Sequence, residues 1–207
     1  MEVTDTAETI QDAVAEEAAA ERERTAVRER FRQRGALATA GLAMLLAISA
    51  VGGGNATKNM LSANIQASDT YAFYQAKNVR QTSVRLAQEQ LELLMPALPP
   101  EQQAAARARI DEYRATVARY ESEPQTGEGK KELLEKATLY VQQRDRAQRQ
   151  DPNFDFSQAL FQIAIVLGSV AIVAVSGRVL ALALGLGAIA TLLMLNGFLL
   201  LVDLPIG

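Results

Sequence analysis

The sequence predicts an all-α membrane protein with three transmembrane helices and a long extramembrane antiparallel helical hairpin, a coiled-coil-like stalk, between helices one and two. Three observations predict this class. Uncharged apolar runs of 17, 17 and 24 residues occur at 35–51, 159–175 and 179–202. The 41 residues at 55–95, between the first two runs, contain neither glycine nor proline. Beyond a proline-rich turn, apolar residues recur at alternating spacings of four and three.

The apolar runs have the lengths that membrane spans require. A helix rises about 1.5 Å per residue and the hydrocarbon core is about 30 Å thick, so the two shorter runs are minimal spans and the third is ample. Buried helices of a soluble core are the alternative, which the third run disfavours. The first run is expected to be an anchor and not a signal peptide, because the 34 residues before it hold nine acids.

These lengths define the expected domains. The transmembrane helices are predicted at 35–53, 158–177 and 178–203. A charged helical tail at 1–34 precedes them, the hairpin occupies 54–157, and 204–207 form a short outward C-terminus.

The arginines predict the orientation. Six arginines lie between residues 22 and 34, and Arg178 lies in the short turn between the second and third runs. Basic flanks stay on the cytoplasmic side, so we expect a cytoplasmic N-terminus and an outward-facing 54–157. In a bacterium this is the inner membrane, with 54–157 in the periplasm. The arginine-rich tail is expected either to contact anionic headgroups or to form ion pairs along its own helix.

Glycine and proline mark the expected helix ends in the hairpin. Gly52–Gly54 should separate the first span from the helix at 55–95, with Asn55 as its N-cap. The "PALPP" turn at 96–100 starts a descending helix, which "PQTGEG" at 124–129 interrupts. Helix resumes at Lys130 and is expected to end before Asp151-Pro152. The two limbs then have similar lengths, which predicts that 124–129 loop out midway.

The apolar spacings on the descending limb predict a coiled-coil seam, and folding the hairpin about Leu98 predicts its partners. The seam residues are Ala106, Ile110, Tyr113, Val117 and Tyr120, followed by Leu134, Ala137 and Val141. The expected apolar pairs are Leu86–Ile110, Val79–Val117, Ile65–Ala137 and Leu61–Val141. The leftover apolar residues Leu91, Leu93, Leu133 and Tyr140 are expected to contact other copies, which predicts a homo-oligomer.

The most distinctive stretch is "SDTYAFYQAKNVRQ" at 68–81, with three aromatics, one acid and two bases. In the predicted hairpin it lies opposite the break at 124–129. A broken helix leaves carbonyl and N–H groups unpaired, so this stretch is interpreted as a structural clasp. Tyr71 and Tyr74 would fill the gap beside the break, and Gln75 or Asn78 would bond the loose backbone groups.

The charged residues of the stretch complete this hypothesis. Asp69 would lie near the start of the helix at Lys130, where negative charge is favoured. Lys77 and Arg80 would pair with acids such as Glu121 or Glu123, or with another copy. The alternative interpretation is an exposed recognition surface for a protein partner.

The second and third apolar runs hold two carboxamides, Gln162 and Asn196, both toward the outward side. We expect a hydrogen bond between them or to another copy, worth about 0.6 kcal/mol and at most about 2 kcal/mol. Alternatively, each bonds its own backbone or interfacial water.

The stretch after the first span resembles a known family. The family pattern A-S-D-x-x-A-x-Y-Q-A-K-x-x-R is matched by Ala67, Ser68, Asp69, Ala72, Tyr74, Gln75, Ala76, Lys77 and Arg80. The chain is thereby similar to bacterial integral membrane proteins described as "domain of unknown function 4337", in which tryptophan often stands at the position of Tyr71. The resemblance also covers the Arg- and Glu-rich middle, "DPNFDFSQALFQIAIVLGS" and the closing pair of apolar runs. It implies the topology and supplies no activity.

Composition narrows the functional classes. The chain has no cysteine and no histidine, which removes thiol nucleophiles, histidine bases and most transition-metal sites. No catalytic residue, metal or cofactor is predicted, and a net charge of −3 gives no reason to expect nucleic acid. The expected function is therefore not enzymatic.

We expect a membrane-anchored structural or scaffold protein that self-associates through its stalk and spans and contacts the lipid bilayer. One alternative is a pore-forming or transporter-associated subunit, because small residues recur at four-residue spacing, which lets helices approach closely. These residues are Thr39, Ala43 and Ala47 in the first run and Ala183, Gly187 and Thr191 in the third. The spans lack ionisable residues, which weakens the pore alternative. A further alternative is an accessory subunit of a larger membrane complex with a protein partner.

Overall fold

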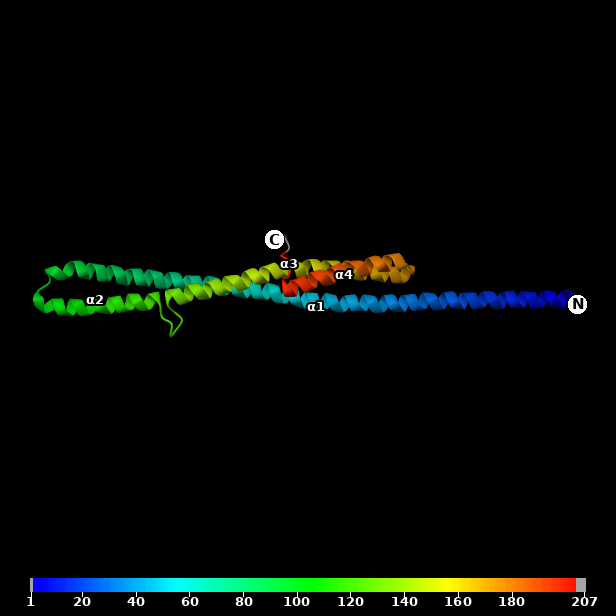
Figure 1. The fold of residues 1–207 in the computed structure, drawn as a ribbon, viewed down its shortest axis with the longest axis horizontal. Helices are drawn as coiled ribbons and strands as arrows, with labels where there is room; N and C mark the ends of the chain where they lie inside the picture. Colours follow the sequence, from blue (N-terminus) through cyan, green and yellow to red (C-terminus); the bar gives the residue numbers. More distant parts are fainter. Residues whose placement is uncertain (1, 204–207) are drawn as a thin grey trace. The chain divides into compact units, whose positions relative to one another are not determined.

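The computed structural model describes residues 2–203, with side chains described at 17 and 19–203. Four α-helices follow one another: α1 (Glu2–Leu94), α2 (Pro100–Glu121), α3 (Lys130–Ala174) and α4 (Gly177–Leu199), with a short 3-10 helix η1 (Met95–Ala97) before α2 (Figure 1). Within the described range there is no strand, which confirms the all-α class. By length and composition, α1, α3 and α4 are each able to cross a membrane.

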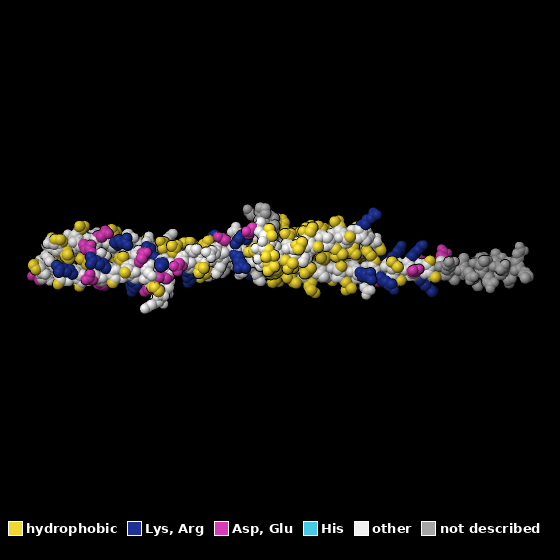
Figure 2. Space-filling view, viewed as in Figure 1, with side chains coloured by type: hydrophobic (Ala, Val, Ile, Leu, Met, Phe, Trp, Pro, Cys, Tyr) yellow, Lys and Arg dark blue, Asp and Glu magenta, His cyan; other side chains and the backbone are white. Residues whose placement is uncertain are grey.

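The helices form two compact units. Unit 1 comprises Met1–Asn55 and Arg149–Gly207, and unit 2 comprises Ala56–Gln148. Long helices α1 and α3 each contribute to both units. Figure 2 shows hydrophobic side chains covering the visible face of unit 1 where α1, α3 and α4 lie together, whereas charged side chains are interspersed over unit 2.

Glycines let the helices of unit 1 approach closely. At three glycines in this unit, an added Cβ would collide with a side chain of another helix. The lack of a side chain at these positions therefore sets the distance between the helices. The contacts are Gly35 with Ile172, Gly168 with Thr39 and Gly187 with Leu42. Of the two small-residue rows, the one on α4 faces inward, because Ala183 and Gly187 are buried, whereas Ala43 and Ala47 on α1 are exposed.

The predicted break at Gly52–Gly54 is wrong, because α1 continues through all three glycines. A Cβ on Gly52 would lie 2.5 Å from Cε1 of Phe154 and 2.9 Å from Cζ of Phe198. Glycine costs a helix about 0.5–1 kcal/mol per residue, and here the buried Phe154 ring packs directly against the α1 backbone. Gly52 therefore serves helix packing, and a glycine run alone did not distinguish packing from a break.

The predicted helix end before Asp151-Pro152 is also wrong, because α3 runs from Lys130 to Ala174 with Pro152 inside it. A proline within a helix removes one backbone donor and clashes with the carbonyl four residues earlier. The next two residues, Asn153 and Phe154, are each only 2% exposed. The Asn153 side chain donates to the Arg149 carbonyl at 2.9 Å, so packing and a side-chain bond hold the helix together at this point.

In unit 2, the second part of α1 contacts α2 and the first part of α3. Gln81 on α1 donates to the Val117 carbonyl on α2 at 3.0 Å, and Arg114 on α2 forms an ion pair with Glu92 on α1 at 2.8 Å. The inward positions of α1 recur at alternating spacings of four and three. They are Ala56, Met60, Ala63, Ala67, Thr70, Tyr74, Lys77, Gln81, Val84, Gln88 and Leu91.

The face of α1 that points inward in unit 2 is not the face that the expected pairing required. Leu61, Ile65, Val79 and Leu86 are each more than half exposed, although apolar partners were expected for them. Gln81 instead lies against Val117, two residues from the expected partner Val79. The inward face of α1 therefore consists largely of alanine and polar residues.

After the break, the descending seam differs from the expected one in that Leu133 takes the inward position assigned to Leu134. Ala106, Ile110 and Ala137 are buried as expected, and Tyr113, Val117, Tyr120 and Val141 are half-buried. Leu133, expected to contact another copy, is buried within the chain, whereas Leu134 is 45% exposed. Of the other residues assigned to oligomer contacts, Leu91 and Tyr140 are half-buried and Leu93 is 81% exposed.

Candidate functional site

The break between α2 and α3 is the most densely bonded polar region of unit 2. α2 ends at Glu121 and α3 starts at Lys130, and the chain between them turns back on itself: the Gly127 N–H donates to the Glu123 carbonyl at 2.9 Å. Gly127 has φ +70°, a conformation that favours glycine. A Cβ on Gly129 would lie 2.6 Å from the Ser122 Cα. The loop therefore begins and ends at neighbouring points.

Lys77 is the centre of this region and is only 5% exposed. Its ammonium donates to the Glu128 carbonyl and lies 3.6 Å from the Glu123 carboxylate and 3.8 Å from the Glu128 carboxylate. The ring centroids of Phe73 and Tyr120 lie 5.4 Å and 5.9 Å from the same nitrogen. A buried ammonium needs such partners to offset its desolvation, and the loop residues Glu123 and Glu128 supply three of them.

Gln81 forms a second connection one helical turn further along α1. Its amide nitrogen donates to the Val117 carbonyl at 3.0 Å and to the Glu121 carboxylate at 2.9 Å. Its oxygen accepts from Lys130 at 2.8 Å, and Lys130 lies 3.3 Å from the Glu121 carboxylate. Gln81 thus bonds the last turn of α2 and the first residue of α3 together.

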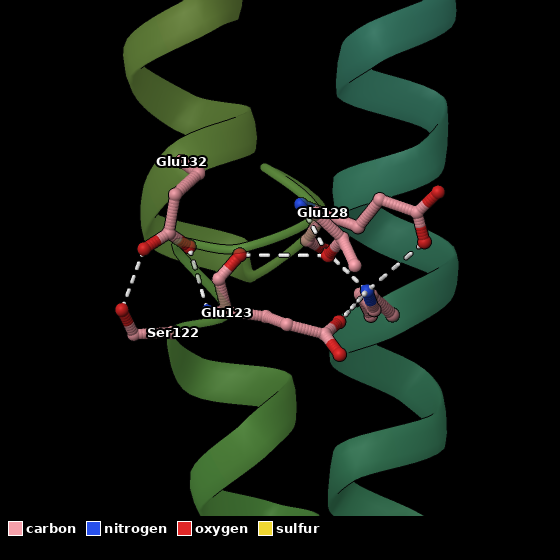
Figure 3. A network of polar contacts seen from close by, with 6 residues as sticks. Ser122, Glu123, Glu128 and Glu132 are labelled. Carbon is pink, nitrogen blue, oxygen red and sulfur yellow. Dashed lines mark hydrogen bonds and ion pairs between the residues drawn. The ribbon is translucent and has the colours of Figure 1, made fainter.

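Glu132 spans the break from within α3 (Figure 3). Its carboxylate accepts the Ser122 hydroxyl at 2.5 Å and the Glu123 backbone N–H at 3.1 Å. A glutamate at the third position of a helix ordinarily bonds the N–H of its own N-cap residue. Here it bonds the end of the preceding helix, so α2 and α3 are linked across the looped-out residues.

The hydroxyl of Ser122, followed by the backbone N–H groups of Glu132 itself and of Glu123, holds the pKa of Glu132 below its ordinary value of 4.5. The amide of Gln81, followed by Lys130, likewise lowers the pKa of Glu121. A carboxyl with a lowered pKa stabilises the fold above its ordinary pKa, and this contribution is lost as the pH falls through the folded-state value.

We therefore expect the thermal midpoint of the protein to fall on acidification below about pH 4.5. Glu132→Gln keeps an acceptor oxygen but does not titrate, so it should make this decline shallower. Circular dichroism melts between pH 7 and pH 3.5 measure the slope. Glu135→Gln, an exposed position one turn along α3, is the control and should keep the wild-type slope. Equal slopes for the two variants would refute the role of Glu132.

The structure divides the expected clasp residues into two groups. Lys77 lies beside Glu123, one of the two acids expected for it, and Tyr74 is half-buried with the Lys130 ammonium 5.8 Å from its ring centroid. Tyr71 is 37% exposed. The remaining members Asp69, Gln75, Asn78 and Arg80 are exposed, and among the described residues none of them bonds the break through its side chain.

The backbone groups at the break are therefore satisfied by other residues than expected. Lys77 and Gln81 take the role assigned to Gln75 or Asn78, and Glu132 takes the position assigned to Asp69. Gln81 was missed, although a signal for it exists in the sequence. It follows Ala67 and Tyr74 at intervals of seven, so counting heptads from Ala67 would have placed Gln81 on the inward face.

The carboxamide expectation is corrected in a similar way. Asn196 donates to the Asn153 side-chain oxygen at 2.8 Å and to the Val202 carbonyl at 2.9 Å, and it accepts the Val202 N–H at 2.9 Å. Both amide hydrogens of Asn196 are used in these bonds, and among the described residues no hydrogen bond joins Asn196 to Gln162. Gln162 is exposed, and its pairing with another copy stays a prediction. Asn153 lies before the expected span and was therefore not considered.

A cluster at the same end of unit 1 joins all three of its helices. The Phe154 ring of α3 packs edge-on against Phe198 of α4, with centroids 4.9 Å apart, and contacts the backbone at Gly52 and Gly197. The Ser49 and Ser157 hydroxyls bond each other, and Ser157 also donates to the Phe154 carbonyl at 2.9 Å. Every buried side-chain nitrogen and oxygen in the described residues has a partner.

These arrangements neutralise charges and satisfy backbone groups. Each ammonium at the break faces carboxylates or an amide oxygen, and the described residues contain no group of three or more acids, histidines or cysteines able to hold a metal ion. The geometry is therefore that of a site which fixes the conformation of the chain.

Comparison with known proteins gives one match. The model of the family described as "Domain of unknown function (DUF4337)" matches residues 31–200. No curated protein and no solved structure matches the chain.

Proposed function

Since the chain belongs to the DUF4337 family, whose description assigns no activity, we propose a function from its own geometry: a membrane-anchored structural protein that self-associates through unit 2. The observation that carries the proposal is the combination of two features in one chain. Three helices have the length and composition of membrane spans, and two of them, α1 and α3, continue into a helical unit whose polar break is bonded within the chain.

The details of unit 2 support a coiled-coil hairpin. The inward residues of α1 keep a seven-residue repeat from Ala56 to Leu91, and those of α2 and α3 keep it on either side of the loop. The inward position after Tyr120 is expected four residues later. If the six residues at 124–129 are left out of the count, the residue four positions after Tyr120 is Lys130. The loop therefore leaves the repeat in phase.

The arginines support an orientation with the N-terminus in the cytoplasm and residues 54–157 outside, in the periplasm of a bacterial inner membrane. Six arginines between residues 22 and 34 precede the first apolar segment, and Arg178 lies in the first turn of α4. The chain lacks cysteine, so single-cysteine variants report one site each. We expect Gly127→Cys to react with a membrane-impermeant maleimide in intact cells and Ser176→Cys to react only after permeabilisation. The reverse pattern would contradict the orientation.

A measurement of ion conductance distinguishes a structural protein from a pore-forming subunit. The apolar runs at 35–51, 159–175 and 179–202 contain no ionisable residue, and ionisable residues inside membrane spans are typical of ion pathways. We expect purified protein in planar bilayers to give no selective current. Reproducible ion-selective currents that a Gly187→Leu variant abolishes would favour a pore-forming subunit.

A further inference from the structure

One helix face in unit 2 is left without a partner in the chain. On α1, the positions farthest from the inward face are Ile65, Ala72, Val79, Leu86 and Leu93, which recur every seven residues. All five are exposed, Val79 to 64% and Leu93 to 81%. We call them the outer stripe. It is the most apolar row of this part of α1, and it faces away from α2 and α3.

The residues beside the outer stripe are unusually free of charge. The flanking positions from Leu61 to Gln90 are Leu61, Ser62, Ser68, Asp69, Gln75, Ala76, Thr82, Ser83, Glu89 and Gln90, all exposed. Only Asp69 and Glu89 among them are charged. A solvated helix face ordinarily carries many charges, so the composition indicates a covered face.

The other limb of the same unit provides an internal comparison. The equivalent outward positions of α2 and α3 include, among alanines and other uncharged residues, six exposed charged residues: Asp111, Glu112, Arg119, Lys131, Glu135 and Arg146. The descending limb thus carries several exposed charges on its outward positions, whereas the outer stripe of α1 and the positions beside it carry only Asp69 and Glu89.

Resting on the proposed self-association, we infer that the outer stripe is the interface, and that a second copy of this chain covers it with its own outer stripe, in parallel and in register. An apolar row that recurs every seven residues over four heptads, with mostly small or uncharged residues beside it, fits a second helix running alongside. A lipid surface would call for lysine and arginine at the flanks, and the flanks contain none.

The parallel arrangement follows from the membrane. Copies inserted in one bilayer share one orientation, so their α1 helices run in the same direction. About a two-fold axis parallel to the helices, each outer-stripe residue faces its own counterpart. Ala72 lies at the middle of the motif and Ala76 lies beside it, and such small side chains let the two backbones approach closely. The exposed half of the 68–81 motif thereby forms part of the interface.

Single-cysteine cross-linking tests this geometry because the protein has no native cysteine. Ile65→Cys, Val79→Cys and Leu93→Cys are introduced one at a time into the full chain and oxidised in native membranes. A disulfide requires Cα atoms within about 7 Å, so a parallel in-register pair should give strong disulfide-linked dimer at all three positions. Ala115→Cys, exposed on the outward face of α2, is the matched control and should give at least fivefold less dimer.

Each other outcome overturns the inference in a defined way. An antiparallel pair would cross-link Val79→Cys and leave Ile65→Cys and Leu93→Cys unlinked. A disulfide-linked product whose mass is the sum of this chain and a different polypeptide would show that the partner is another protein. If none of the three exceeds Ala115→Cys while the native protein is still a multimer by mass, the interface lies elsewhere and the proposed self-association stands. If the native protein is also a monomer, both fail.

Discussion

Replacing Phe154 with alanine is expected to destabilise unit 1 by about 3–5 kcal/mol, the range for removing a large buried aromatic ring. The Phe154 side chain is 2% exposed and packs between α1 and α4. Its removal leaves a cavity beside Gly52 and Gly197, which have no side chains to fill it. At about 2–4 °C per kcal/mol for a chain of this size, the thermal midpoint in detergent should fall by about 10 °C.

Phe156→Ala is the matched control, because it removes the same ring two residues along the helix at a position that is 45% exposed. It should shift the midpoint by less than a third of the Phe154→Ala shift. Size-exclusion chromatography after heating measures both variants. Similar shifts for the two variants would show that Phe154 does not hold the three helices together.

Deleting residues 124–129 is expected to leave unit 2 folded, with a free energy of unfolding within about 1 kcal/mol of wild type, because six residues are removed without changing the heptad phase. Glu123 would then precede Lys130 directly, and the inward positions of α2 and α3 would follow one another in one helix. Lys77 would lose Glu128 but keep Glu123, which lies 3.6 Å away. Circular dichroism should show a cooperative melt and at least the wild-type helix content.

Deleting only 124–127 is the control, and it should have the larger effect. It leaves the repeat two residues out of phase, so that Leu133 and Ala137, which are 4% and 0% exposed, would rotate out of the seam. Burying a leucine is worth about 2–5 kcal/mol in such variants, so unit 2 should lose its cooperative transition. Equal stability of the two deletions would contradict the in-phase loop.

The sequence predicted the helices better than their ends. Length and hydropathy were sufficient for three apolar helices, and proline was sufficient for the turn before α2. Gly52 and Pro152 were misread because their local preferences were considered without Phe154, which packs against one and follows the other closely. Local propensity is a weak signal where tertiary packing opposes it.

The candidate site shows the same limit in another form. The matched lengths of the two limbs predicted that residues 68–81 lie opposite the break at 124–129. The structure agrees, because Lys77 lies beside Glu123. The inward face of α1 was misassigned because Val79 and Leu86 are apolar and were therefore expected inside. The inward face instead holds alanines, which allow the helices to approach closely, and it holds Lys77 and Gln81 at the level of the break, where they donate hydrogen bonds. The apolar residues of the outer stripe lie on the opposite, exposed face.

The mass of the native protein most directly tests the central claim that the chain self-associates in the membrane. Native mass spectrometry of protein released from membranes measures it without cross-linking. A chain of 22.4 kDa should appear as a multiple of that mass, and Val79→Glu with Leu86→Glu should shift it toward the single-chain mass. A mass of 22.4 kDa for the wild-type protein at every concentration and in every mild detergent would contradict the account.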